Sequence, residues 1–222
     1  EQPDALGNTI NGRLGENDVL DNIFGLGSSD AFKNVKRIQF VACGTSLHAA
    51  KTARKWFEDI CEMPCYIDFA SEYRYRNPIV EDHTLFVTIS QSGETADTLA
   101  ALEYARAEKY VGIVTICNVP TSTMARNADW KIFTNAGPEI GVASTKAFTT
   151  QLAALLMLAL SIAKSQDKNA KKRKQATQEL RETPALVDQA FSLKENISQI
   201  TQNISTKHNA LFLGRGMYFS IA

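Results

Sequence analysis

The chain has 222 residues, of which 44% are hydrophobic and 22% charged. That is enough apolar material for one full core, and it excludes a disordered chain. The 24 Lys and Arg residues balance the 24 Asp and Glu residues, so no net field gathers nucleic acid or an anionic membrane. We therefore expect a globular domain with neither of these partners.

Cysteine usage and the chain start both favour a cytoplasmic protein. None of the four cysteines has a His or Cys neighbour at zinc-ligand spacing, so we expect no metal and free thiols: Cys43, Cys61, Cys65 and Cys117. Residues 1–4 lack the basic and apolar pattern of a signal peptide. The most apolar run, 152–163, is too short to span a bilayer and predicts a buried helix.

The first segment, 1–29, is rich in Gly, Asn and Asp, and it predicts an interdomain linker or N-terminal arm packed on the domain. From residue 30 to 169, short β-rich apolar runs alternate with helical patterns. Alternation of this kind predicts parallel strands joined by helical crossovers. We expect an α/β fold, a three-layer doubly wound sandwich with a mainly parallel five-stranded sheet. The expected strands are 37–43, 65–69, 84–90, 111–117 and 130–134, and the expected helices after the first, third and fifth begin near 44, 95 and 144.

Beyond residue 169 the composition becomes charged and polar, which predicts connecting helices over 170–207. Thr183-Pro184 resembles an N-cap followed by proline at the first helical position, so we expect a helix to begin there. The apolar residues at helical spacing that follow predict a helix that packs back on the domain or on a partner, and ordinary core packing is favoured for them: Leu186, Ala190, Leu193, Ile197, Ile200 and Ile204. Residues 210–213 predict a strand, so 208–222 is interpreted as the truncated start of a second α/β domain.

Three segments dense in hydroxyls and small residues follow expected strands: 43–46, 90–95 and 141–146. Open α/β sheets bind ligands where strands turn into helices. Helix N-termini there offer free N–H groups and a positive dipole end, and Ser and Thr add neutral donors, which together suit a phosphate. The alternative for each segment is an ordinary N-cap. Glu94 is interpreted as a helix-start carboxylate, and a packed or solvated side chain is favoured over a site role for His48.

Two nucleotide motifs are missing from these segments. No GxxxxGK[ST] loop is present, which disfavours Walker-type ATP binding, and no GxGxxG follows the first strand, which disfavours a dinucleotide. Residues 73–76, Tyr-Arg-Tyr-Arg, are interpreted as a helix end or a subunit contact. The pattern therefore favours the phosphate of a small sugar phosphate.

At these segments the sequence resembles the sugar isomerase (SIS) domain family. CGTS after the first strand, SQSGETADTL after the third and EIGVASTKAFTTQ before the long helix carry the resemblance. The sequence is most similar to the glutamine–fructose-6-phosphate aminotransferase (isomerizing) branch, also called glucosamine-6-phosphate synthases, and SEYRYR, ICNVP and TNAG support that branch. These enzymes make glucosamine 6-phosphate from fructose 6-phosphate and glutamine, in amino-sugar biosynthesis.

The resemblance implies which residues hold the sugar phosphate, which is fructose 6-phosphate or glucosamine 6-phosphate. By motif position they are Thr45, Ser46, Ser90, Gln91, Ser92, Thr95, Val142 and Ser144. The resemblance also implies two tandem SIS domains, with residues 30–169 as the first, and a homodimer. The family's isomerase and glutaminase residues lie outside the matching motifs. We therefore expect a fragment with no catalytic residue and no cofactor, which binds its ligand without turnover.

Two alternatives stay open. One is a regulatory SIS module that senses a phosphosugar without catalysis, which a helix-turn-helix before the domain would favour. The other is a stand-alone phosphosugar isomerase, which would need catalytic residues within one complete domain.

Overall fold

A five-stranded parallel sheet forms the centre of the computed structural model, which describes residues 1–141 and 144–222. The strand order is β2-β1-β3-β4-β5, and every neighbouring pair runs parallel. The expected α/β class and five-stranded sheet are confirmed. The strands are β1 (Arg37–Ala42), β2 (Cys65–Phe69), β3 (Thr84–Ser90), β4 (Ile113–Cys117) and β5 (Trp130–Phe133).

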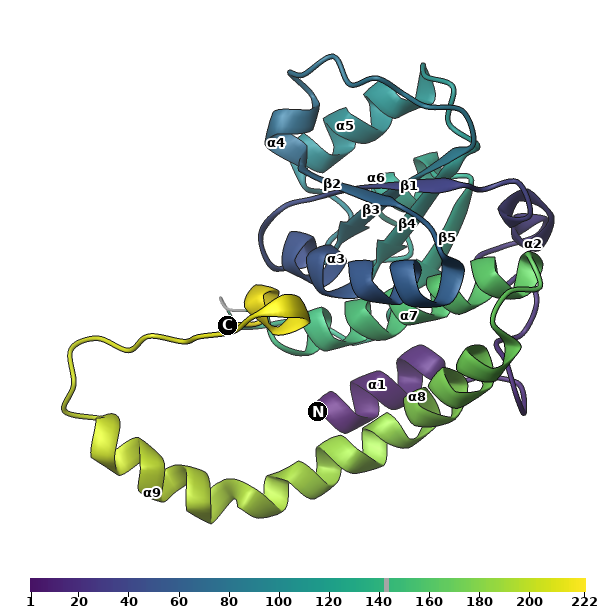
Figure 1. Cartoon of the computed structure of the whole chain (residues 1–222). Coiled ribbons are helices and arrows are strands. Elements are labelled where there is room, and N and C mark those ends of the chain that lie inside the picture. Colours follow the sequence, from purple (N-terminus) through teal and green to yellow (C-terminus); the bar gives the residue numbers. More distant parts are fainter. Residues whose placement is uncertain (142–143) are drawn as a thin grey trace.

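Helices cover both faces of this sheet (Figure 1). On one face lie α3 (Gly44–Trp56), which continues through a π-helical turn η1 (Phe57–Cys61), and the long α7 (Lys146–Ser165); on the other lie α4 (Ala70–Tyr73), α5 (Ala96–Arg106) and α6 (Thr123–Asn127). Strand side chains alternate between two cores, so Phe40 packs with the α7 side and Val41 with the α5 side. All seven residues of β3 are buried, as a strand covered on both faces requires.

α7 is the core helix that the apolar run 152–163 predicts. Among the described residues it is the one helix long and apolar enough to cross a membrane, yet 72% of its most apolar window is buried inside the fold. Its apolar residues belong to the larger of the two cores. The segment is thus a packing element of the sandwich.

The N-terminal arm packs on the domain. Its first helix, α1 (Gln2–Ile10), lies against α7 and α8 (Figure 1). Further along, the Phe24 carbonyl accepts a hydrogen bond from Lys131 N at 2.8 Å, and α2 (Ser28–Phe32) brings Phe32 against Trp130. The arm therefore covers the β5 edge of the sheet.

The opposite edge, β2, is open. Ile38 N donates to Pro64 O at 3.1 Å, which fixes the phase of the pairing between β1 and β2. By alternation, the backbone groups of Cys65, Ile67 and Phe69 point away from β1. Among the described residues, these outward groups have no backbone partner.

The region after residue 169 differs from the sequence-based expectations. α8 runs unbroken over Ala170–Ala190, so the expected helix start at Thr183-Pro184 is wrong. Thr183 Oγ1 donates back to the Glu179 carbonyl at 2.8 Å instead of accepting from a following N–H group. A 3-10 turn, η2 (Phe191–Leu193), then joins α8 to α9 (Lys194–Ile204).

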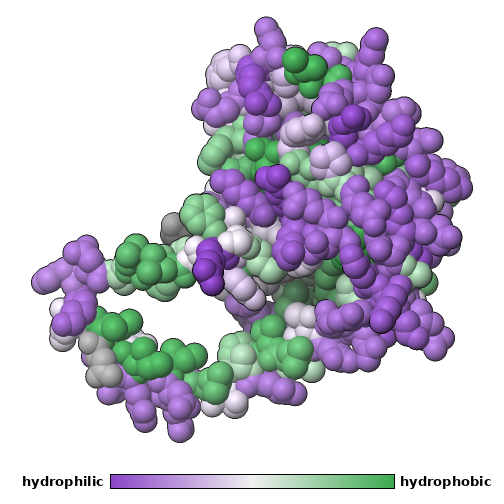
Figure 2. All heavy atoms as spheres, in the orientation of Figure 1, coloured by the Kyte–Doolittle hydropathy of each residue, from purple (hydrophilic) through white to green (hydrophobic). Residues whose placement is uncertain are grey.

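Two further expectations for this region are wrong. The apolar residues expected in a core are exposed, with Leu186, Leu193, Ile197, Ile200 and Ile204 each 53–60% accessible. Residues 210–213 form no strand, because no described strand lies beside them to complete a ladder. The chain instead returns to α3 through the short 3-10 helix η3 (Gly216–Ser220). Figure 2 shows apolar atoms on α9 and on this returning segment at opposite sides of an open gap.

Candidate functional site

The strand order creates a topological switch point between β1 and β3. These strands are neighbours, with Ala42 paired to Ile89, but their crossovers lead in opposite directions. β1 continues into α3 on one face and β3 toward α5 on the other (Figure 1). In open α/β sheets, ligands bind outside the carboxyl ends of the strands at such a switch point. The first two hydroxyl-rich segments, 43–46 and 90–95, lie at this switch point.

The first segment begins α3. Gly44 has φ of +55°, a left-handed conformation that glycine adopts at little cost, and it lies between an extended Cys43 and the first helical turn. Thr45 is exposed and Ser46 is buried. No atom lies within 4 Å of the position that a side chain at residue 44 would take. A ligand can therefore approach the backbone at the start of α3.

The second segment carries a cluster of hydroxyls at the end of β3. Ser90 is buried, and its Oγ accepts a hydrogen bond from Gly93 N at 3.0 Å while it lies 3.0 Å from Thr95 Oγ1. Ser92 Oγ accepts from Glu94 N at 3.1 Å. These bonds hold the hydroxyls in place before any ligand arrives. Between Ser90 and Thr95 one hydroxyl donates to the other, and the remaining hydroxyl hydrogens of the cluster can rotate to donate to an anion.

The first segment contacts the helix that follows the second segment. Thr98 Oγ1, in the first turn of α5, donates to Cys43 Sγ at 3.9 Å. Gln91 is half-buried between the strands, and its carbonyl accepts from Asn118 N at 3.0 Å. Hydroxyl-bearing turns therefore follow both strands of the switch point.

The third segment meets the first around a small cavity. Thr45 and Ser144 line a volume of about 240 Å³, together with His48, Phe148, Ser220 and Ile221. Val142 lies outside the described residues. Among these six residues His48 is the one with a titratable side chain, and it is exposed. The sequence favoured a packed or solvated His48, whereas the structure places it beside Thr45 and Ser144.

The N-terminus of α7 is already occupied by a side chain of the protein. Glu139 Oε2 accepts hydrogen bonds from Thr145 N at 3.2 Å and from Ala147 N at 2.9 Å. A carboxylate at this end of a helix is stabilised by the helix dipole. The sequence predicted that this N-terminus would offer its N–H groups to a phosphate, and Glu139 was not among the predicted site residues.

Asn118, at the end of β4, holds the loop that leads toward α7. Its Oδ1 accepts from Thr134 Oγ1 at 3.1 Å and from Ala136 N at 2.8 Å, while its Nδ2 donates to the Gly137 carbonyl at 2.8 Å. The motif ICNVP contains this residue, but the sequence does not show that its amide bridges two strand ends. A polar residue directly after a buried strand was the available signal.

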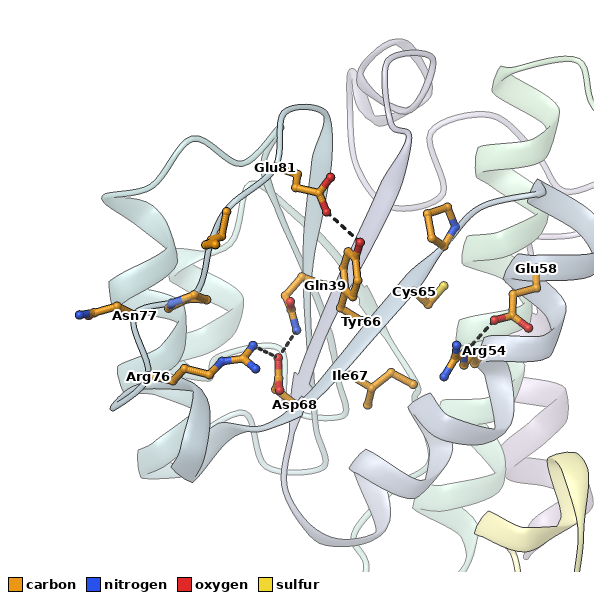
Figure 3. A pocket seen from close by; sticks show the side chains of 13 residues that line it. Gln39, Arg54, Glu58, Cys65, Tyr66, Ile67, Asp68, Arg76, Asn77 and Glu81 are labelled. Carbon is orange, nitrogen blue, oxygen red and sulfur yellow. Dashed lines mark hydrogen bonds and ion pairs between the residues drawn. The ribbon is translucent and has the colours of Figure 1, made fainter.

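Another cavity lies along the open edge of β2, with a volume of about 630 Å³ (Figure 3). Its charged groups pair with one another: Arg76 Nη2 lies 2.6 Å from Asp68 Oδ2, and Arg54 Nε lies 2.7 Å from Glu58 Oε1. It offers no cluster of hydroxyls and no N-terminus of a long helix. The switch point between β1 and β3 is therefore the better candidate for a phosphate site.

The described residues show no metal-ligating or nucleophilic cluster. No group of three or more His, Cys, Asp or Glu among them could hold a metal ion. All four cysteines are free thiols, and burial raises the pKa of Cys61 to about 12 and also raises that of Cys117. These buried thiols are protonated at neutral pH and are poor nucleophiles.

A family model for the SIS domain matches residues 31–161, which include all five strands and most of α7. The chain belongs to the SIS domain family. Its order 2-1-3-4-5 and its hydroxyl-rich turns are therefore those of a SIS domain, and the resemblance inferred from the motifs is confirmed.

The similarity to individual proteins extends beyond this SIS domain. The whole chain is 48% identical to a glutamine–fructose-6-phosphate aminotransferase (isomerizing) from Idiomarina loihiensis, of which it spans 36%. A solved C-terminal domain of glucosamine-fructose-6-phosphate aminotransferase from Francisella tularensis matches the whole chain, with 46% identity and a TM-score of 0.94; the chain covers 62% of it. A solved putative phosphosugar isomerase from Silicibacter pomeroyi shares the fold, with 22% identity and a TM-score of 0.69. The match covers 83% of this chain and 52% of that protein.

Proposed function

We propose that the chain is the sugar-phosphate-binding part of a glutamine–fructose-6-phosphate aminotransferase, and that it binds fructose 6-phosphate or glucosamine 6-phosphate. The observation that carries this proposal is the hydroxyl cluster at the β1/β3 switch point. The 48% identity to an aminotransferase over the whole chain supports the choice of enzyme. In this proposal residues 30–169 form the first SIS domain and 208–222 begin a second.

The phosphate lies between the first two turns in this proposal. Ser90, Ser92 and Thr95 supply hydroxyl donors from one side, with Gln91 between them, and Thr45 and Ser46 supply donors at the start of α3. The 13-residue α3 adds the positive end of its dipole, since no side chain caps its N-terminus. Val142 and Ser144 contact the sugar. Neutral donors of this kind bind a dianion without a competing ion pair.

We further propose that the chain binds its ligand without turnover. Converting a ketose to an aldose requires a base that moves a proton between adjacent carbons. The carboxylates of Glu94 and Glu139 are engaged as hydrogen-bond acceptors for helix N-termini. Sugar conversion by the purified chain would contradict this part of the proposal.

Calorimetric titration tests the binding site. Fructose 6-phosphate should bind and unphosphorylated fructose should not, and Ser92→Ala and Thr95→Ala should each weaken binding by roughly 1.5–3 kcal/mol, the cost of one hydrogen bond to a charged group. Thr121→Ala, in the exposed loop before α6, is the control and should bind like the wild type. Equal binding of both sugars, or no effect of either substitution, would refute the phosphate assignment.

A regulatory SIS module without catalysis remains the second candidate. It predicts the same ligand binding, so the discriminating measurement is enzymatic. An aminotransferase that carries Ser92→Ala in its matching segment should lose activity in proportion to its loss of ligand binding. A sensor module would show no such enzymatic activity at all.

A homodimer is part of the proposal. Exposed apolar residues of α8, η2 and α9 recur at intervals of four, three, four, three and four residues from Leu186 to Ile204, a spacing typical of helix–helix packing. Light scattering should show a dimer that Ile197→Lys converts to a monomer and that Glu195→Lys leaves intact. A monomeric wild-type chain would refute this part.

The free thiols support a cytoplasmic location.

A further inference from the structure

Residues of the second hydroxyl-rich segment, 90–95, accept hydrogen bonds from the N-terminus of α6. Thr123 N donates to Glu94 Oε1 at 2.6 Å, and Met124 N donates to the Gly93 carbonyl at 3.1 Å. Ala125 N donates to the Oγ of Ser122, the N-cap residue, at 3.4 Å. The N–H groups of a first helical turn have no partner within the helix. Here each of these three has an acceptor, two of them from residues 93 and 94.

Residues 93 and 94 are also pressed against α6 by packing. Gly93 is buried with φ of +67°, and a side chain there would come within 2.5 Å of Ser122 Cβ. The segment therefore meets α6 at backbone contact distance. The hydroxyls of Ser92 and Thr95 lie immediately before and after this contact.

We propose that Glu94 is a positioning residue, whose carboxylate holds the 90–95 segment on α6 so that the hydroxyls of Ser90, Ser92 and Thr95 keep the arrangement that binds phosphate. This inference rests on the proposed function, because it assigns the hydroxyls to a phosphate. The observed bond differs from the role expected for Glu94. The carboxylate accepts a hydrogen bond from the N-terminus of the neighbouring α6, and not from α5, the helix that follows it.

A simpler role for Glu94 predicts the opposite effect. The hydrogen bonds from Thr123 lower the pKa of the Glu94 carboxyl, so it is ionised at neutral pH. If it were only a nearby negative charge, it would repel a phosphate dianion, and its removal would tighten binding. If it positions the segment, its removal loosens the hydroxyl cluster and weakens binding. The sign of the change distinguishes the two roles.

The test compares Glu94→Ala and Glu94→Gln with the wild-type chain, by titration with fructose 6-phosphate. Glu94→Ala should raise Kd about 3- to 30-fold, the range for losing a helix N-terminal acceptor. Glu94→Gln should fall between Glu94→Ala and wild type, because its amide oxygen still accepts a bond about half as strong. Glu103→Gln, an exposed position on α5, is the matched control and should bind like the wild type.

Amide hydrogen exchange gives a readout that does not depend on the ligand. Glu94→Ala should speed exchange at Thr123 N, while amides in β3 keep their protection, which also shows that the variant is folded. Unchanged exchange at Thr123, or tighter ligand binding by both variants, would overturn the positioning role. A wild-type chain that binds no sugar phosphate would instead refute the proposed function, whatever the exchange shows.

Discussion

Replacing Gly93 with alanine should destabilise the protein through two separate effects. The residue has φ of +67°, where a side chain costs about 1–2 kcal/mol. A Cβ there would also lie 2.5 Å from the Cβ of Ser122, which is 1% exposed and cannot move toward solvent. Overpacking of this kind costs about 1–3 kcal/mol. We therefore expect Gly93→Ala to lower the free energy of unfolding by about 2–5 kcal/mol.

Gly44→Ala isolates the backbone effect. Gly44 has a similar φ of +55°, but no atom lies within 4 Å of its added Cβ, so it should lose only about 1–2 kcal/mol. Urea titration followed by circular dichroism measures both variants. The difference between them reports the contact with Ser122.

Ser122→Gly removes the atoms that the new side chain would meet. Glycine in place of serine at an N-cap costs only a few tenths of a kcal/mol. The double variant Gly93→Ala/Ser122→Gly should therefore recover most of the overpacking cost and keep the backbone cost. The reasoning fails if Gly93→Ala and Gly44→Ala are equally stable, or if the double variant shows no recovery.

Two further predictions concern the arm and the core. Asp18→Ala should lower the free energy of unfolding by about 1.5–3 kcal/mol, because Asp18 Oδ2 lies 2.8 Å from Nε of the largely buried Arg173. Asp21→Ala removes a more exposed ion pair with Lys164 and should cost less than about 1 kcal/mol. Equal losses of the two variants in urea titration would contradict this reasoning. Burial raises the pKa of Cys61 to about 12, so iodoacetamide at pH 8 should leave this thiol unmodified until urea unfolds the protein. Mass spectrometry after labelling of the native protein measures this. Alkylated Cys61 would contradict the prediction, because it would show that the thiol is accessible.

Local sequence patterns predict the sheet well. The bounds of β2 and β3 match the expected 65–69 and 84–90. β3 is a wholly buried run, and it ends at the polar turn that contains Gly93. β4 begins at Ile113 rather than at 111, although Val111 N already donates to the Thr84 carbonyl at 2.8 Å. Differences of this size reflect ladder bonds at the strand ends, which the sequence does not show.

Long-range contacts explain what the sequence could not predict. Thr183-Pro184 has the sequence pattern of an N-cap, yet α8 continues through the proline. The preceding residues favour a helix, and side-chain hydrogen bonds between successive turns stabilise it, such as the one from Gln175 Nε2 to Glu179 Oε1 at 2.8 Å. The stripe from Leu186 to Ile204 has the pattern of a buried helix face, and periodicity does not say which surface covers it. At the candidate site, Glu94 bonds to the N-terminus of α6 and not to that of α5, the helix expected from the sequence. Glu139, to which the sequence assigned no role, bonds to the N-terminus of α7. Both contacts depend on tertiary placement.

The two edges of the sheet differ in how they respond to another extended chain. Phe24 occupies a hydrogen-bonding position on β5, whereas the outward backbone groups of Cys65, Ile67 and Phe69 on β2 are free to pair. Uncovered edges favour aggregation, and flanking charges oppose it. Here Asp68, paired with Arg76, supplies such charges. Loss of the arm would expose the β5 edge as well, and a molecule with two open edges can polymerise, whereas a molecule with one can at most pair.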